Sequence, residues 1–436
     1  MDIIWVYAVV FFGTLVLLLS VGVPVSISTG IIGTLGGIII LGLKGTDIYA
    51  KTALSASSNF LLLAIPFFVF MANLLESSGL ADDLYESFYR WMGRLRGGLA
   101  MGTVIICAIF AAMAGISSVA TVTMGLVALP SMIKRGYNKH LAVGSVAGGG
   151  ALGILIPPSL VLILYGAETD VSIGKLFLGG MAPGILLALL FIVYIAIRSF
   201  INPALCPAVE ERYTAREKVL ALKAVVLPMI LVFMVLFSIY SGVATPTEAA
   251  AGGAFGALIC CAFKRRLTKD VFSTAVMKTL VLSGMIMWIV IGAEAFTHVL
   301  AYSRVQMKIL EVITGLQVHP WIILIGIQVM YFVLGMILDP AGIVLLTIPI
   351  VFPVISALGF DPLWFGILFT INMEMAYLTP PFGFNLFIMK TIVPPNITIQ
   401  DIYRSIIPFV MLQALCLIIV MLFPSIATWL PSLMMG

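Results

Sequence analysis

The strings Leu155-Ile156-Pro157-Pro158-Ser159 and Leu378-Thr379-Pro380-Pro381-Phe382 decide the fold, and each lies inside a long apolar run. Proline has no backbone N–H and clashes with the carbonyl four residues earlier, so each Pro-Pro pair leaves carbonyl groups without helical partners. The two strings are 223 residues apart, which is close to half of the 436-residue chain. The sequence therefore predicts two related halves that each contain an unwound helix.

The same spacing separates other residues, including Pro130 from Pro353 and Gly136 from Gly359. It also places Gly115-Ile116-Ser117-Ser118 on Leu338-Asp339-Pro340-Ala341. Two halves with discontinuous helices at equivalent positions are typical of secondary transporters, whose site lies between the repeats. We expect a first inverted repeat over 1–200, a polar connector over 201–223 and a second inverted repeat over 224–436.

The composition predicts an all-α, polytopic membrane protein. Hydrophobic residues make up 62% of the chain and charged residues 10%, whereas soluble domains are about half apolar and a quarter charged. The charge-free stretch from Asp2 to Lys44 is long enough for two membrane helices, broken around Gly22-Val23-Pro24. Leu43 replaces the lysine of a phosphate loop and the three histidines are scattered. These features argue against an enzyme and against an ATP-driven pump, and the net charge of +4 makes nucleic acid an improbable partner.

Interruptions within apolar runs mark the expected internal site. We predict re-entrant hairpins over about 47–96 and 270–312, with Ser57-Ser58-Asn59 and Gly292-Ala293-Glu294 at their tips. Ordinary kinked spans are the alternative. Broken helices are expected over about 99–133 and 321–357, interrupted at Gly115 and at Asp339.

The oxygen-bearing groups at these interruptions suit a hard cation such as sodium. Backbone carbonyls freed by Pro-Pro are typical cation ligands in transporters, although neighbouring helices can also satisfy them. Ser117, Ser118 and Thr121 add hydroxyl groups beside the first interruption. Asp339 stands beside Gly342 in the second half, where a carboxylate is either functional or the cap of the next helix.

Other polar residues in apolar runs are candidates for contact with a substrate. Glu294 and Glu374 are either site-lining or structural, and Asn385 follows Pro381 by four residues. The expected substrate contacts are Pro157, Pro158, Ser159, Glu294, Glu374, Pro380, Pro381 and Asn385.

Basic clusters give an orientation. Lys134, Arg135 and Lys139, the connector, and the cluster at 264–269 would all be cytoplasmic under the positive-inside rule. If each half makes five crossings, both termini are then outside, and Arg90, Arg94 and Arg96 fall on the opposite side from the other basic clusters.

Several strings in this order resemble the large membrane subunit of tripartite ATP-independent periplasmic (TRAP) transporters, the DctM-like family. They are Leu63-Ala64-Ile65-Pro66-Phe67-Phe68, Ile154-Leu155-Ile156-Pro157-Pro158-Ser159, Ser172-Ile173-Gly174-Lys175-Leu176-Phe177, Pro349-Ile350-Val351-Phe352-Pro353, and Leu378-Thr379-Pro380-Pro381-Phe382-Gly383-Phe384-Asn385.

The resemblance implies a sodium-coupled elevator transporter in the bacterial inner membrane. It also implies a small four-helix membrane (Q) subunit and a periplasmic substrate-binding (P) protein as partners, and sodium ions rather than a cofactor. The family's sodium sites would correspond to Ser57, Ser58, Asn59, Gly115, Ser117, Ser118, Thr121, Gly292, Ala293, Asp339 and Gly342. Thr379, beside the second Pro-Pro pair, is a further candidate sodium ligand.

One departure from the family pattern broadens the expected substrate. Members that carry C4-dicarboxylates or sialic acid commonly show Gly-x-Ser-Gly-Ser-Ala at the first interruption, whereas this chain has Gly115-Ile116-Ser117-Ser118-Val119-Ala120. We therefore expect a small organic anion, either a carboxylate or a sulfonate, carried with at least two sodium ions. The alternative is a stand-alone antiporter or channel that works without a binding protein.

Overall fold

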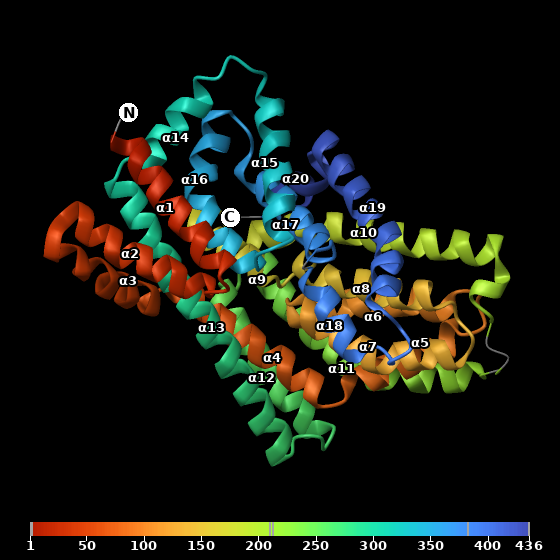
Figure 1. Ribbon diagram of the computed structural model, residues 1–436. Helices are drawn as coiled ribbons and strands as arrows, with labels where there is room; N and C mark the ends of the chain where they lie inside the picture. Colours follow the sequence, from red (N-terminus) through yellow and green to blue (C-terminus); the bar gives the residue numbers. More distant parts are fainter. Residues whose placement is uncertain (1–2, 209–210, 212, 382, 435–436) are drawn as a thin grey trace.

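The computed structural model describes residues 3–208, 211, 213–381 and 383–434, and this part of the chain is built from helices joined by short turns (Figure 1). Nine of the described helices are long and apolar enough to cross a membrane, or ten if the bent pair Ala215–Ala221 and Val225–Tyr240 is one span. The chain is thus an all-α, multi-pass membrane protein.

The helix order recurs in the two halves. The first half contains α1 (Ile3–Ser20), α2 (Val25–Leu41), η1 (Gly42–Gly45), α3 (Thr46–Ser58), η2 (Phe60–Leu63), α4 (Ala64–Ser77), α5 (Leu80–Met92), α6 (Gly98–Ala114), α7 (Ser117–Lys134), α8 (Lys139–Ala151), η3 (Leu152–Ile154), α9 (Leu160–Thr169) and α10 (Ile173–Ile201). After η4 (Pro203–Leu205), the second half contains α11 (Ala215–Tyr240), α12 (Pro246–Phe263), α13 (Lys269–Tyr302), α14 (Val305–Thr314), α15 (Pro320–Gly335), α16 (Pro340–Ala357), α17 (Pro362–Tyr377), α18 (Phe384–Ile392), α19 (Ile399–Leu422) and α20 (Ser425–Ser432). Adding 223 to the bounds of α7 gives those of α16.

The expected break near Gly22 is present, because α1 ends at Ser20 and α2 begins at Val25. The chain then turns through η1 and α3 folds back along α2, as Figure 1 shows at its left side. Close approach of Gly37 to Gly45 and of Gly30 to Tyr49 holds the two helices together.

The segments expected to be broken helices are instead helical hairpins. The backbone N–H of Leu99, at the start of α6, donates to the Tyr137 hydroxyl just after α7, at 3.4 Å. At the equivalent place in the second half, the Trp321 and Phe360 rings lie 5.9 Å apart. The chain therefore reverses at Gly115-Ile116 and between α15 and α16. The two helices of the first hairpin have 17 and 18 residues, so each is about 26 Å long at 1.5 Å per residue.

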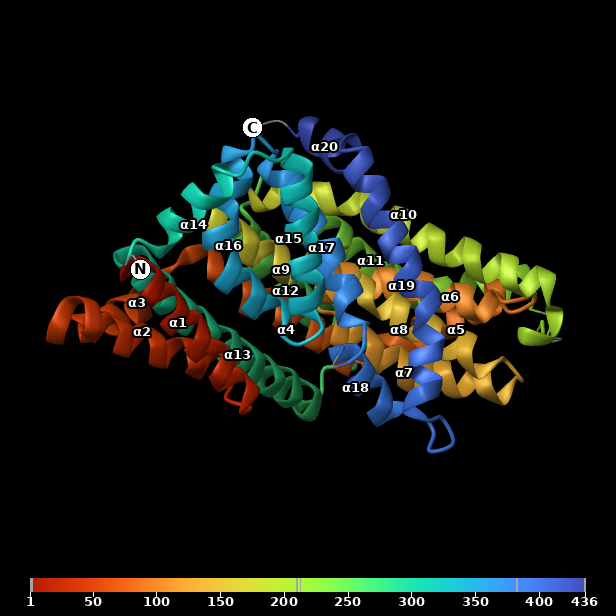
Figure 2. The ribbon, with the colours of Figure 1, turned by 45° about the horizontal axis from the view of Figure 1, so that its top comes forward.

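The segments expected to be hairpins instead form two extended helical arms, one made of α3 and α4 and the other made of α13. Thr52 of α3 pairs with His298 at 3.1 Å, and Asn73 of α4 donates to Thr279 at 3.2 Å. One pair lies near each end of α13, so α3 and α4 together run antiparallel along α13 and do not reverse at Asn59. Figure 2 shows the length of α13 beside α1 and α2.

Gly292-Ala293-Glu294 is not a tip, because α13 is continuous through it. A Cβ atom on Gly292 would meet the Ser26 backbone carbonyl and the Thr29 hydroxyl of α2. This glycine therefore permits a close helix crossing rather than a chain reversal. The arm of the first half is interrupted at Asn59, whose side-chain oxygen accepts a hydrogen bond from Leu61 N at 3.0 Å.

Basic and acidic side chains gather at one end of the molecule. Asp83 of α5 pairs with Arg266 at 2.8 Å and with Lys264 at 3.2 Å. Arg135 donates to the Tyr89 hydroxyl at 2.9 Å, and Tyr89 in turn donates to Glu211 of the connector at 2.5 Å. Hydrogen bonds from Tyr89 and Tyr213 hold the pKa of Glu211 below its usual value.

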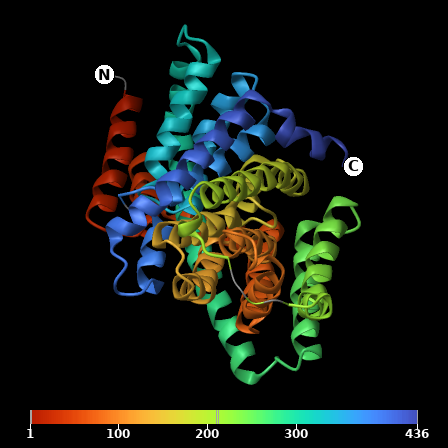
Figure 3. The ribbon, with the colours of Figure 1, turned by 90° about the vertical axis from the view of Figure 1, so that its right-hand side faces the viewer.

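The hairpin corrects the expected orientation of the arginines. Because α6 and α7 reverse, Arg94 and Arg96 lie at the same end as Lys134 and Arg135 rather than on the opposite side. Beside them, α11 and α12 pack together at one side of the molecule (Figure 3).

Candidate functional site

The tip of the first hairpin packs against the first Pro-Pro unwinding. Gly115 has φ +64°, and a Cβ atom there would overlap the carbonyl oxygen of Pro158. The Gly115 carbonyl accepts a hydrogen bond from Leu160 N at 3.3 Å. The hairpin tip and the start of α9 thus form one compact unit.

The second half contributes to this first tip through α18. Asn385 Nδ2 donates to Ser117 Oγ at 2.5 Å, and both side chains are buried. The Asn385 side-chain oxygen and the Thr121 hydroxyl, one turn into α7, are buried and have no hydrogen-bond partner among the residues that the structure describes. Buried polar atoms are nearly always paired, so two such oxygens beside one tip indicate a position that can bind a ligand.

The chemistry of these atoms fits an alkali cation. Hydroxyl, amide and backbone carbonyl oxygens are the hard, neutral ligands that sodium accepts. Gly150 leaves room for Thr121, because a Cβ atom on Gly150 would overlap the Thr121 hydroxyl. Ser118 is half-buried at the same tip.

Not every predicted group is free for a ligand. Ser159 donates to the Ile154 carbonyl and accepts from Leu162 N as the N-cap of α9. Its hydroxyl therefore satisfies one of the carbonyls that the buried Pro157 and Pro158 would otherwise leave unpaired.

The second tip is capped by a carboxylate. Asp339 accepts hydrogen bonds from Ala341 N at 3.0 Å and Gly342 N at 3.4 Å, at the N-terminus of α16. Gly335, at the end of α15, packs directly on Ala376 of α17. The second hairpin therefore lies one helical turn from the second unwinding, at Thr379, Pro380 and Pro381.

The predicted residues on the arms lie elsewhere. Ser58 is exposed, while Ser57 and Asn59 line a cavity of about 170 Å³ to which Ser283 of α13 also contributes. Gly292 and Ala293 are buried in the contact of α13 with its neighbours, and Glu294 is half-buried on the same helix. A role for these residues in sodium or substrate binding stays a prediction.

Glu374 is fully buried in α17, and the side chain that faces it is Gln413 of α19. It does not line the first tip, where the polar contacts come from Ser117, Thr121 and Asn385. Contact of Glu374 with a substrate likewise stays a prediction.

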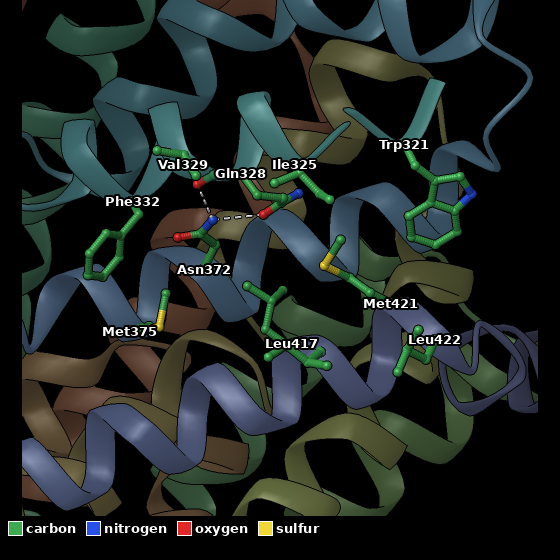
Figure 4. Close-up of a pocket in the computed structure, with 11 residues that line it drawn as sticks. Trp321, Ile325, Gln328, Val329, Phe332, Asn372, Met375, Leu417, Met421 and Leu422 are labelled. Atoms are coloured by element: carbon green, nitrogen blue, oxygen red, sulfur yellow. Dashed lines mark hydrogen bonds between the residues drawn. The ribbon is translucent and has the colours of Figure 1, made fainter. Parts of the chain in front are cut away.

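Sequence reasoning did not single out Gln328. Its backbone carbonyl and side-chain oxygen both accept hydrogen bonds from Asn372 Nδ2 at 2.7 Å, which ties α15 to α17. The pair borders a cavity of about 450 Å³ whose other walls are apolar (Figure 4). Because neither hairpin tip lines this cavity, we do not assign it to the substrate. An isolated glutamine within an apolar run was the available signal.

Comparison with solved structures gives the class of fold. The YdaH transporter of Alcanivorax borkumensis superposes with a TM-score of 0.65 over 93% of this chain and 96% of that one, at 13% sequence identity. This chain therefore shares its overall fold with that transporter.

Residues 12–426 match the family described as "Tripartite ATP-independent periplasmic transporter, DctM component". The C4-dicarboxylate TRAP transporter large permease protein DctM of Vibrio cholerae is 34% identical, over 96% of each chain. The isethionate TRAP transporter permease protein DctMQ of Oleidesulfovibrio alaskensis is 32% identical over 96% of this chain and 65% of its own length. The chain belongs to the DctM family of TRAP transporter large permeases. It is a transport protein of the inner membrane and not an enzyme.

Proposed function

We propose that this chain is the permease of a sodium-coupled uptake system for a small organic anion. The observation that carries the proposal is the first hairpin tip, where Asn385 contacts Ser117, the Pro158 carbonyl contacts Gly115, and the oxygens of Thr121 and Asn385 have no hydrogen-bond partner among the described residues. A cation there would join both halves of the chain. Sodium occupancy would thereby be linked to the packing of the two halves.

The anionic substrate class is supported by helix ends and by relatives. The N-termini of α7 and α16 lie at the two tips, and a helix N-terminus favours negative charge. Relatives are named for C4-dicarboxylates and for isethionate, a sulfonate. A carboxylate or a sulfonate suits both observations.

The energy available from the membrane potential bears on the number of coupling ions. One charge moving through about 100 mV gains about 2.3 kcal/mol. Two sodium ions carried with a dianion move no net charge, so uptake then relies on the sodium concentration gradient or on a third ion. We propose at least two sodium ions.

An elevator motion is supported by the way the helices group. The arm group, α1–α4 and α11–α14, packs around α13 and α4, while the hairpin group comprises α6–α10 and α15–α20. We propose that the hairpin group moves past the arm group and carries the site with it. A small membrane subunit and a periplasmic binding protein complete the system by family membership.

The test is uptake of labelled dicarboxylate or sulfonate into proteoliposomes that contain this chain and its small subunit. Sodium and the binding protein are omitted in turn, and we expect each omission to abolish accumulation. Accumulation with potassium in place of sodium would refute sodium coupling. Accumulation by this chain alone would indicate a stand-alone transporter.

A further inference from the structure

A carboxyl group without a partner is buried where α17, α19 and α10 meet. Glu374 of α17 has no exposed surface, and neither of its side-chain oxygens has a hydrogen-bond partner in the described structure. Buried carboxylates in proteins are ordinarily paired with a cation or with several hydrogen-bond donors. This group therefore needs an explanation that the sodium site does not supply.

An equally buried amide faces the carboxyl group. Gln413 of α19 has no exposed surface, and neither its side-chain oxygen nor its nitrogen has a partner among the described residues. Its amide is directed at Glu374 without closing a hydrogen bond of normal geometry. Cys416, one turn further along α19, is the ionisable neighbour on that helix, and its thiol is directed at the Pro183 carbonyl of α10 at 3.8 Å.

Four ionisable groups on other helices around α17 are engaged elsewhere. Tyr165 of α9 donates to Pro362 O at 2.7 Å, and Tyr331 of α15 contacts Thr347 at 3.2 Å. His140 of α8 lies 3.1 Å from Ser405, and Lys390 of α18 donates to Ile397 O at 3.0 Å. None of these contacts supplies a positive charge to Glu374.

The protonated form satisfies every one of these atoms. A carboxylic acid has one O–H donor and one carbonyl acceptor, and a primary amide offers the matching acceptor and donor. The Glu374 O–H would donate to the Gln413 oxygen, while the Gln413 nitrogen would donate to the second Glu374 oxygen. An ionised carboxylate would accept only the second of these bonds and would leave the amide oxygen and a charge unpaired.

We propose that Glu374 and Gln413 form a proton-binding site within the hairpin group. A proton from the solvent binds the carboxylate, and the resulting acid–amide pair holds α19 against α17. Loss of the proton leaves a bare charge in the helix contact and weakens it. This site is separate from the sodium site at the first hairpin tip and does not depend on it.

Infrared spectroscopy of the full chain with its small subunit in lipid nanodiscs tests the proposal directly. The carbonyl stretch of a protonated carboxylic acid should be present in the wild type near neutral pH and absent in Glu374→Gln. The matched control is Glu86→Gln, which removes an exposed carboxylate of α5 and should leave that band unchanged. Gln413→Leu should shift the band to the higher frequency of an acid without an amide partner.

Thermal unfolding against pH provides the second readout. The wild type should lose stability as the pH rises above the ordinary range of a glutamate pKa, because the carboxyl group ionises more readily in the unfolded chain than in the buried site. Glu374→Gln, which imitates the neutral acid, should lack this loss, and Glu86→Gln should retain it. If Glu374→Gln does not assemble, the proposal is tested by the infrared band of the wild type and by its shift in Gln413→Leu.

Two results would overturn the proposal. One is a wild-type spectrum in which no protonated-acid band is lost in Glu374→Gln or shifted in Gln413→Leu. The other is removal of that band by sodium at constant pH, which would make Glu374 a cation ligand instead.

Discussion

Ser117 and Asn385 are separated by 268 positions in the sequence, yet they share a hydrogen bond at the first hairpin tip. The proposed cation would lie beside both, so each residue should influence the other's contribution. Residues in direct contact typically show coupling of about 0.5–3 kcal/mol in double-mutant cycles.

We predict that Asn385→Ala raises the sodium concentration for half-maximal uptake about tenfold, which corresponds to about 1.4 kcal/mol for one lost oxygen ligand. Ser117→Ala should have a similar effect, and the double variant should show less than the sum. Thr391→Ala, an exposed position on the same helix α18, is the control. Unchanged sodium dependence in both single variants would contradict the assignment.

Asp339 can be tested for a role beyond capping. Asp339→Asn keeps an oxygen that can accept from Ala341 N and Gly342 N, so we expect little change in melting temperature. Asp339→Leu removes the cap and should cost about 1 kcal/mol. If Asp339 also binds sodium, the asparagine variant should need more sodium for half-maximal uptake. An asparagine variant with normal sodium dependence would show that Asp339 only caps α16.

Sequence reasoning singled out Ser117, Asp339 and Asn385 because each is a polar residue close to a glycine or proline interruption, and their roles in binding stay predictions. The same logic misplaced Gly292, since a glycine that permits a helix crossing looks identical in sequence to one that permits a turn. Gln328 and Gln413 were missed because their importance depends on which helix faces them. Only the packing of α15, α17 and α19 reveals that.

At the level of single elements, the first hairpin depends on one backbone conformation. Gly115 combines φ +64° with direct contact to Pro158, so any side chain there is both strained and overlapping. We predict that Gly115→Ala lowers the free energy of unfolding by more than about 1–3 kcal/mol, the usual range for such strain alone. The control is Gly252→Ala in α12, where a Cβ atom meets nothing within 4 Å. Equal melting temperatures for the two variants would contradict this packing.

The interruptions were predictable from sequence, but the path of the chain across them was not. Glycine and serine at 115–118 weaken a helix whether the chain continues or reverses. Whether the chain reverses is shown by contacts between the outer ends of the two helices, such as the hydrogen bond between Leu99 and Tyr137. For the arms, Thr52–His298 and Asn73–Thr279 show continuation along α13.

For the whole molecule, the hairpin gives a testable orientation. Arg96 and Lys269 are exposed at the basic end, which the positive-inside rule assigns to the cytoplasm. Val243 lies in the exposed turn after α11, at the opposite end. We predict that a membrane-impermeant thiol reagent added outside intact cells labels Val243→Cys but neither Arg96→Cys nor Lys269→Cys. Labelling of all three from one side would contradict this arrangement.

The proposed movement of the hairpin group past the arm group can be blocked by a crosslink. A Cβ atom on Gly342 of α16 would lie 3.9 Å from Val25 Cβ of α2, within the range of about 3.5–4.5 Å for a disulfide. We predict that oxidation of the Val25→Cys, Gly342→Cys variant stops uptake and that reduction restores it.

Each single cysteine variant is the control for this crosslink and should be insensitive to oxidation. Uptake that continues while the crosslink is complete would contradict movement between the two groups.

The arms of the two halves differ at one place, since Asn59 interrupts the first arm whereas α13 runs unbroken. In a chain with two identical halves, exchanging their conformations would produce an end state of equal energy. The unequal arms remove that degeneracy. Even with equal ion concentrations on both membrane faces, the transporter would rest in one end state, and the partner or ion that reverses this bias must supply the energy difference.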